Sequence, residues 1–134
     1  MTVRPPEPEG DARRSAVAFG KAAEAFVARQ LASDGWAILA ANWRGAGVAA
    51  CELDLVVSRA GALRFVEVKA RTQEQLDDAL EALTPDKQAR LRRAAEAWFA
   101  AFGLPEREAA FLLAVVTAAS DGSPLTVTWW DDPF

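Results

Sequence analysis

The sequence predicts an α/β protein whose elements follow the order α-β-β-β-α-β-β, with room for one extra short helix. Two long segments repeat apolar residues at helical spacing, one before residue 34 and one after residue 84. Five shorter segments are rich in β-branched and aromatic residues, which favour strands. The length of 134 residues suits a single domain with one core, and the chain contains no internal repeat.

The first helix is expected to follow a cap at Asp11 or Ser15 and to run to about Ser33. Residues 1–12 are rich in proline and glutamate, so we expect a disordered tail there and one domain over residues 13–134. The inward side of the helix is expected to carry apolar and neutral residues at helical spacing: Phe19, Ala23, Val27, Gln30 and Leu31.

Glu24 falls at the margin of that inward side. The simpler interpretation is a solvated edge position. The functional alternative is that Gly20 lets the helix approach a sheet closely, so that Glu24 leans toward other charged residues.

Three strands are expected next. The segment from Trp36 to Trp43 is apolar on both faces, which is typical of a central strand. After the loop of residues 45–50, the segments Cys51 to Val57 and Leu63 to Lys69 form two strands. The short turn between them makes these strands antiparallel neighbours.

The remaining chain predicts a short acidic helix or mobile segment over residues 73–83, then a helix capped by Thr84 that runs to about Phe102. Lys87 lies one turn before Leu91 on the same inward side of the helix. Its ammonium group therefore either extends to the solvent-exposed rim of the core or serves a polar site. Arg90, Arg92 and Arg93 lie off this apolar stripe and are most simply a solvated face. Two strands, residues 109–117 and 125–130, complete the chain around a tight turn at residues 120–123.

The composition narrows the chemistry. The chain has no histidine and one cysteine, which excludes Ser-His-Asp and Cys-His catalysis, histidine-ligated metals and an intrachain disulfide. We find no apolar run long enough to span a membrane and no secretory signal, so we expect a cytoplasmic protein. The net charge of −4 argues against simple coating of nucleic acid, although residues 74–81 alone hold four acids and no base.

Charged residues interrupt the two antiparallel strands at alternate positions. Glu52 and Asp54 should point to one side of the first strand, and Glu67 and Lys69 to one side of the second. If these sides coincide, carboxylates and an ammonium converge in an apolar setting, where a cation would offset the repulsion. Oxygen ligands of this kind suit Mg²⁺.

This arrangement predicts a site for phosphodiester hydrolysis. Asp54 and Glu67 could share one Mg²⁺ (or Mn²⁺) with the carbonyl of Val68, and Lys69 could orient the attacking water or hold the phosphate. The alternative is that the strands simply carry cross-strand ion pairs on an exposed surface.

The sequence also resembles the bacterial YraN-like family of endonuclease-like proteins, within the PD-(D/E)XK nuclease superfamily. The resemblance covers about residues 20–102. It implies a restriction-endonuclease-like fold, with a mixed central sheet flanked by helices, similar to Holliday-junction resolvases. The matching motifs are Gly20 to Glu24, Asn42 to Arg44, Glu52 to Val56, Phe65 to Arg71 and Thr84 to Gln88.

The resemblance implies metal-site roles for Asp54 and Glu67, a catalytic role for Lys69, and additional site roles for Glu24 and Lys87. It implies DNA as the substrate, including branched or damaged forms. The oligomeric state stays open, a homodimer included.

Three departures from the family are visible in the sequence. Cys51 replaces the usual glycine, the loop of residues 45–50 looks longer than usual, and the late strand reads Ala110-Phe111-Leu112 in place of Arg-Phe-Asp. These departures and the acidic pI favour a second hypothesis, a catalytically inactive nucleic-acid- or partner-binding module that retains the fold. A third hypothesis is a structural scaffold whose charged hairpin is only surface. Exposure of Glu67 and Lys69 would support it, and burial of both in a shared cleft would exclude it.

Overall fold

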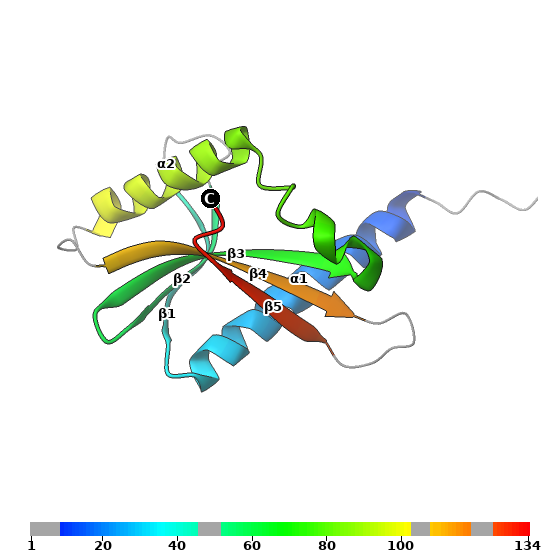
Figure 1. Cartoon of the computed structure of the whole chain (residues 1–134), viewed down its shortest axis with the longest axis horizontal. Helices are drawn as coiled ribbons and strands as arrows, with labels where there is room; N and C mark the ends of the chain where they lie inside the picture. Colours follow the sequence, from blue (N-terminus) through cyan, green and yellow to red (C-terminus); the bar gives the residue numbers. More distant parts are fainter. Residues whose placement is uncertain (1–8, 46–51, 103–107, 119–124) are drawn as a thin grey trace, which may run out of the picture.

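The computed structural model describes residues 9–45, 52–102, 108–118 and 125–134, and its elements follow the expected order (Figure 1). Three predicted features lie outside these ranges: the start of the second strand at Cys51, the end of the second long helix at Gly103 and the turn at residues 120–123. The elements are α1 (Glu9–Ser33), β1 (Ala37–Arg44), β2 (Glu52–Arg59), β3 (Ala62–Thr72), the 3₁₀ helix η1 (Gln73–Asp78), α2 (Pro85–Phe102), β4 (Glu108–Ala118) and β5 (Thr126–Asp131).

The five strands form one mixed sheet in the order β1-β2-β3-β4-β5. β3 pairs antiparallel with β2 and parallel with β4, and the outer pairs are antiparallel. The α2 crossover joins the two parallel strands, as parallel neighbours require. β3 is therefore the middle strand, which confirms the expectation that its Phe65, Val66 and neighbouring residues are well buried.

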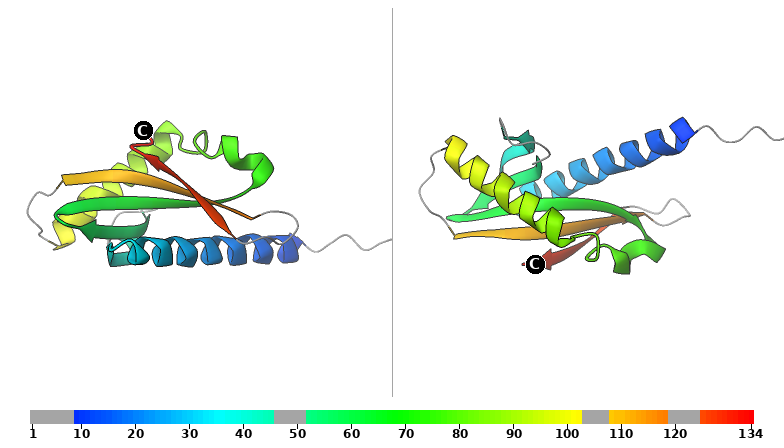
Figure 2. Two further views of the ribbon diagram at one scale, coloured as in Figure 1. Left: turned by 60° about the horizontal axis from the view of Figure 1, so that its bottom comes forward. Right: turned by 90° about the horizontal axis from the view of Figure 1, so that it is seen from above.

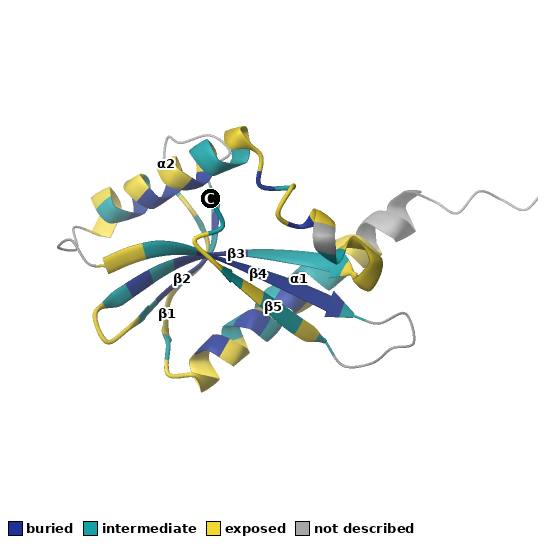
Figure 3. Cartoon of the chain, in the orientation of Figure 1, coloured by how far each residue is buried: buried dark blue, intermediate teal, exposed yellow. Residues whose placement is uncertain are grey.

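The two long helices cover opposite faces of the sheet, and each face has its own apolar core (Figures 2 and 3). On the α1 side, the helix residues Ala23, Val27 and Leu31 pack against Leu55, Val57, Val66, Leu112, Ala114 and Val116. On the α2 side, Leu91, Ala94, Ala95 and Trp98 pack against Leu53, Leu63, Phe65, Leu113 and Val115. The architecture is thus three layers, helix–sheet–helix.

The predicted central position of the first strand is wrong. β1 pairs only with β2, because the far edge of β3 is taken by β4, and β1 is left at the edge of the sheet. Its apolar side chains Ile38 and Leu39 are accordingly exposed, and its register with β2 shifts between Ile38 and Ala40. Such a bulge is common at sheet edges.

The first helix begins earlier than expected. α1 starts at Glu9, so residues 9–12 are helical rather than part of a disordered tail. The last N-terminal proline is Pro8, and every residue of α1 carries the backbone N–H that a helix needs. Gln30, expected on the inward side, is exposed. None of the helices in the described ranges is long and apolar enough to cross a membrane.

The cap of α2 is confirmed. The Lys87 backbone N–H donates to Thr84 Oγ1 at 3.2 Å, and the Gln88 backbone N–H donates to the Thr84 carbonyl at 2.8 Å. Pro85 occupies the first helical position, where its missing N–H has no helical partner to lose. Thr84 thereby fixes where α2 begins and hence where Lys87 projects.

Candidate active site

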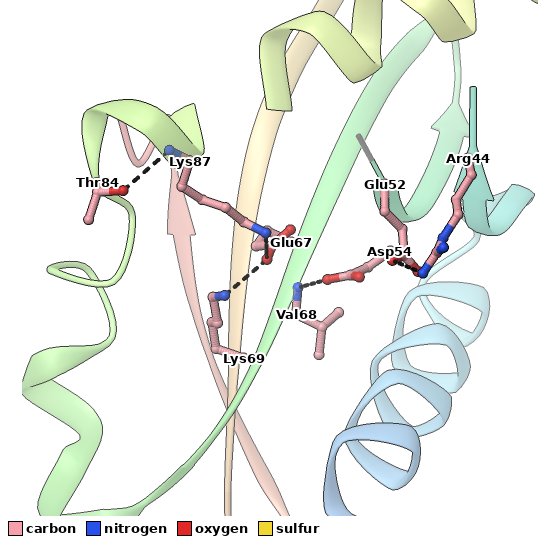
Figure 4. A network of polar contacts seen from close by, with 8 residues as sticks. All are labelled: Arg44, Glu52, Asp54, Glu67, Val68, Lys69, Thr84 and Lys87. Carbon is pink, nitrogen blue, oxygen red and sulfur yellow. Dashed lines mark hydrogen bonds and ion pairs between the residues drawn. The ribbon is translucent and has the colours of Figure 1, made fainter. Parts of the chain in front are cut away.

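The candidate site forms where β2 and β3 separate. Their ladder runs from the pair Arg59 and Ala62 to the pair Leu55 and Val66, and the next residue of β2 is Asp54. Asp54 Oδ2 accepts a hydrogen bond from the Val68 backbone N–H at 2.8 Å (Figure 4). The carboxylate thus takes the place of a backbone acceptor between the two strands.

The alternation of side chains along β2 breaks at this point. Leu53 packs in the α2-side core, whereas Leu55, two residues later, packs in the α1-side core. In a regular strand, residues two apart share a face. Asp54 therefore lies at an irregularity, and its side chain points toward β3 rather than straight out from one face of the sheet.

Glu67 and Lys69 lie on the α2 side of β3, since the alternating residues Val66 and Val68 pack toward α1. Glu67 is only 6% exposed. Lys69 Nζ lies 3.1 Å from Glu67 Oε1, and Lys87 Nζ reaches the same oxygen from α2 at 3.4 Å (Figure 4). Lys87 therefore reaches a buried carboxylate rather than only the rim. The burial of Glu67 and the half-burial of Lys69 count against a purely exposed hairpin.

The electrostatics connect the two strands. Burial and then the negative charge of Glu67 raise the pKa of Asp54 to about 7, while the hydrogen bond from Val68 opposes the shift. Two carboxyl groups thus influence each other across the separated strands, although Glu67 points toward the two lysines. Burial beside a second acid favours a proton or a cation at Asp54.

A cleft of about 750 Å³ opens on the other side, between α1 and the β1–β2 edge of the sheet. Three carboxylate residues line it, Glu24 from α1 and Glu52 and Asp54 from β2. Burial raises the pKa of Glu24, while a hydrogen bond with Asn42 opposes the shift. Glu24 is thus half-buried in the cleft and is not the freely solvated edge residue that its helical position suggested.

Gly20 also lines this cleft, and the alternative in which Gly20 lets α1 approach the sheet closely is wrong. A Cβ built on Gly20 would meet no atom within 4 Å. The space above Gly20 is part of the open cleft. Because Gly20 has no side chain, the cleft is wider at this point, and the helix is no nearer to the sheet.

The structure therefore divides the expected site residues into two groups. Asp54 binds the Val68 backbone, and Lys69 and Lys87 contact the neighbouring Glu67. Glu24 and Glu52 line the α1-side cleft, which they share with Asp54. Glu52 forms an ion pair with Arg44, whose Nη2 lies 3.3 Å from Glu52 Oε2. In the ranges that the structure describes, no three acidic, cysteine or histidine side chains form a set that could hold a metal ion.

Asn42 is a site residue to which the sequence predicted no role. It lies in the cleft with a backbone φ of 50°, a left-handed conformation that asparagine tolerates better than most residues. Its side chain contacts Glu24. An asparagine inside an otherwise apolar strand is the signal that marks it in the sequence.

Residues 23–116 match the model of the uncharacterised protein family UPF0102. The chain belongs to this family. All five residues expected to act in catalysis lie within the matched range of the UPF0102 model, and the YraN-like resemblance is confirmed at the level of this family.

Three UPF0102 relatives illustrate the similarity. The chain is 39% identical over 101 residues to a UPF0102 protein of Oleidesulfovibrio alaskensis, which covers 75% of the chain and 48% of the relative. It is 48% identical over 90 residues to one of Synechococcus sp., covering 64% of each. It is 40% identical over 100 residues to one of Nitratidesulfovibrio vulgaris, covering 75% of the chain and 72% of the relative. The match thus spans only about half of the first relative's length.

Proposed function

We propose that this UPF0102 protein is a metal-dependent endonuclease-like hydrolase of the PD-(D/E)XK superfamily, acting on phosphodiester bonds in DNA, including branched or damaged forms. The observation that carries the proposal is that Asp54 binds the Val68 backbone N–H beside the buried Glu67, whose carboxylate contacts Lys69. Carboxylates and an ammonium are the groups that phosphoryl transfer needs where histidine is absent.

The residues fit a hard divalent cation. Asp54 and Glu67 offer carboxylate oxygens, and their mutual repulsion, visible in the raised pKa of Asp54, would be relieved by positive charge. The Val68 N–H faces Asp54, and the N–H and C=O of one strand residue lie on the same edge of the strand. The Val68 carbonyl is therefore directed toward the same gap and is a fitting third ligand.

The chain's own residues suit the remaining tasks. Bound at this site, Mg²⁺ or Mn²⁺ supplies a water of lowered pKa and stabilises charge on the phosphate. Lys69 lies beside Glu67, where it can orient that water or hold the scissile phosphate. Lys87 offsets the charge of Glu67 from α2. Glu24 and Glu52 line the adjoining cleft, where they would act on groups held by Asp54 rather than by Glu67.

Cleavage of a panel of linear, branched and single-stranded DNA with Mg²⁺ or Mn²⁺ tests the proposal. We expect Asp54→Asn to abolish cleavage, because the variant keeps an acceptor for the Val68 N–H and loses only the charge. Glu96→Gln, which removes an exposed acid from α2, is the matched control and should cleave normally. Absence of cleavage by the wild-type chain on every substrate with both metals would reject the enzyme.

One observation favours the second candidate, an inactive nucleic-acid- or partner-binding module. Glu67 Oε1 is bound by two lysines, and these would compete with a metal ion for it. Calorimetric titration with Mn²⁺ separates the two candidates. Tight Mn²⁺ binding that is lost in Glu67→Gln favours the hydrolase, whereas salt-dependent DNA binding by a chain that binds no Mn²⁺ favours the module.

A further inference from the structure

The first half of α2 carries a strip of positive charge that extends beyond the Lys87 of the hydrolytic site. Residues 85–95 contain four cationic side chains and one acid. At about 100° per residue, Arg90 and Arg93 are turned about 60° and 120° from Lys87 in one direction, and Arg92 about 140° in the other. We call the strip made by Lys87, Arg90 and Arg93 the basic flank.

Arg92 marks the opposite side of the helix. Its guanidinium lies 5.1 Å from the ring centroid of Phe134, which follows β5. The basic flank therefore faces away from β5, toward the β1–β2 side of the sheet, and Arg90 and Arg93 are exposed there. Among the described residues, no carboxylate forms an ion pair with either arginine.

Lys87 links the basic flank to the hydrolytic site. Its Nζ lies 3.4 Å from Glu67 Oε1, the oxygen that Lys69 also contacts (Figure 4). A chain of cations thus leads from the exposed surface of α2 down to the buried carboxylate. A polyanion lying along Arg90 and Arg93 would pass over Lys87, at the entrance to the site.

The opposite side of the sheet offers no such strip of cations. The cleft between α1 and the β1–β2 edge is lined by Glu24, Glu52 and Asp54 beside Lys21 and Arg44, and Arg44 is paired with Glu52. These side chains carry no net positive charge that would attract a phosphate backbone. The acidic segment of residues 73–83, with Glu74, Asp78 and Glu81 exposed, lies before α2 and accounts for much of the net charge of −4.

We propose that the phosphodiester backbone of a DNA duplex docks on the basic flank, with Lys87 at the junction with the buried Glu67. This inference rests on the proposed function and deepens it by assigning the face from which DNA approaches. The contacts are to phosphates, so they position the duplex without reading its sequence. The exposed acids before α2 limit the contact at the N-terminal end of the helix.

Salt-dependent DNA binding without added metal, where no hydrolysis occurs, tests the assignment. We compare the wild-type chain with Arg90→Ala/Arg93→Ala and with the charge-matched control Arg29→Ala/Arg92→Ala. Arg29 lies exposed on α1 and Arg92 on the far flank of α2. A 20-base-pair duplex is titrated by fluorescence anisotropy at several salt concentrations.

We expect the plot of log Kobs against log salt to become shallower by about 2 in the Arg90→Ala/Arg93→Ala variant, since each lost phosphate contact removes about 0.9 from the slope. The control should keep the wild-type slope. Equal slopes in the two double variants, or no duplex binding by the wild-type chain, would overturn the inference.

The outcomes separate this inference from the proposed function. If the chain cleaves DNA with metal but Arg90→Ala/Arg93→Ala binds DNA as the wild-type chain does, the docking of DNA on the basic flank is rejected and the proposed hydrolase activity stands. Binding through the flank with no cleavage under any metal rejects the hydrolase and keeps the flank.

Discussion

Asp54 is a carboxyl group whose surroundings favour its protonated form. Burial, and then the charge of Glu67, raise its pKa from an ordinary 3.8 to about 7. Between about pH 4 and pH 7 the folded chain therefore holds this proton more tightly than the unfolded chain. The free energy of unfolding should fall as the pH rises through this window and should become constant with respect to Asp54 above it.

Asp54→Asn should remove this contribution. The amide oxygen can still accept the Val68 N–H, and no charge has to be buried at high pH. At about pH 8 we expect the variant to be more stable than the wild-type chain by about 2–4 kcal/mol, and at about pH 4 to be equally stable. Urea unfolding across this range measures the difference, with Glu96→Gln as control. A variant that is less stable than the wild-type chain at pH 8 contradicts the prediction.

Part of the site follows from local spacing and part does not. The alternation Glu67-Val68-Lys69 places the acid and the base on one face, and the helical phase of Lys87 turns it inward, so their meeting could be predicted from the sequence. The position of Asp54 could not, because regular alternation would pair it with Glu52 on one face. Its turn toward β3 depends on where the β2–β3 ladder ends, which is a tertiary feature.

Among the elements, α2 is one whose bounds could be predicted from neighbouring residues in the sequence. Its bounds, Pro85–Phe102, agree with the sequence prediction because the Thr84-Pro85 pair supplies a cap and a preset φ within a few residues. The edge position of β1 has no local signal. An apolar strand becomes central or peripheral according to which strands take the far edges of its neighbours, and here β4 takes the far edge of β3.

The cap of α2 should support both stability and the position of Lys87. Thr84→Ala removes the acceptor of the Lys87 backbone N–H and should lower the free energy of unfolding by about 1 kcal/mol. Thr84→Ser keeps the hydroxyl and should retain most of that stability. Urea unfolding of the three chains provides the comparison, and equal losses in the alanine and serine variants would show that the hydroxyl makes no contribution.

At the scale of the whole molecule, the three middle strands β2, β3 and β4 carry buried residues on both faces of the sheet, and the sheet separates two cores that share no buried residue. The two cores are nevertheless joined through the same strands, since alternate residues of β3 and β4 point to opposite faces. This connection predicts that the cores unfold together, although their side chains do not touch. The site at Val68 lies on a strand that both cores hold in place.

Val27→Ala on the α1 side and Leu91→Ala on the α2 side test this arrangement. Both residues are buried, so each change should leave a cavity and lower the free energy of unfolding, by about 2 kcal/mol for valine and about 2–5 kcal/mol for leucine. Because the sheet lies between them, the double variant should show the sum of the two losses within about 0.5 kcal/mol. Urea unfolding followed by tryptophan fluorescence and by far-ultraviolet circular dichroism should give coincident single transitions in the wild-type and singly substituted chains. Separate transitions would mean that each helix layer unfolds independently, and a large coupling energy would mean that the strands transmit repacking from one face to the other.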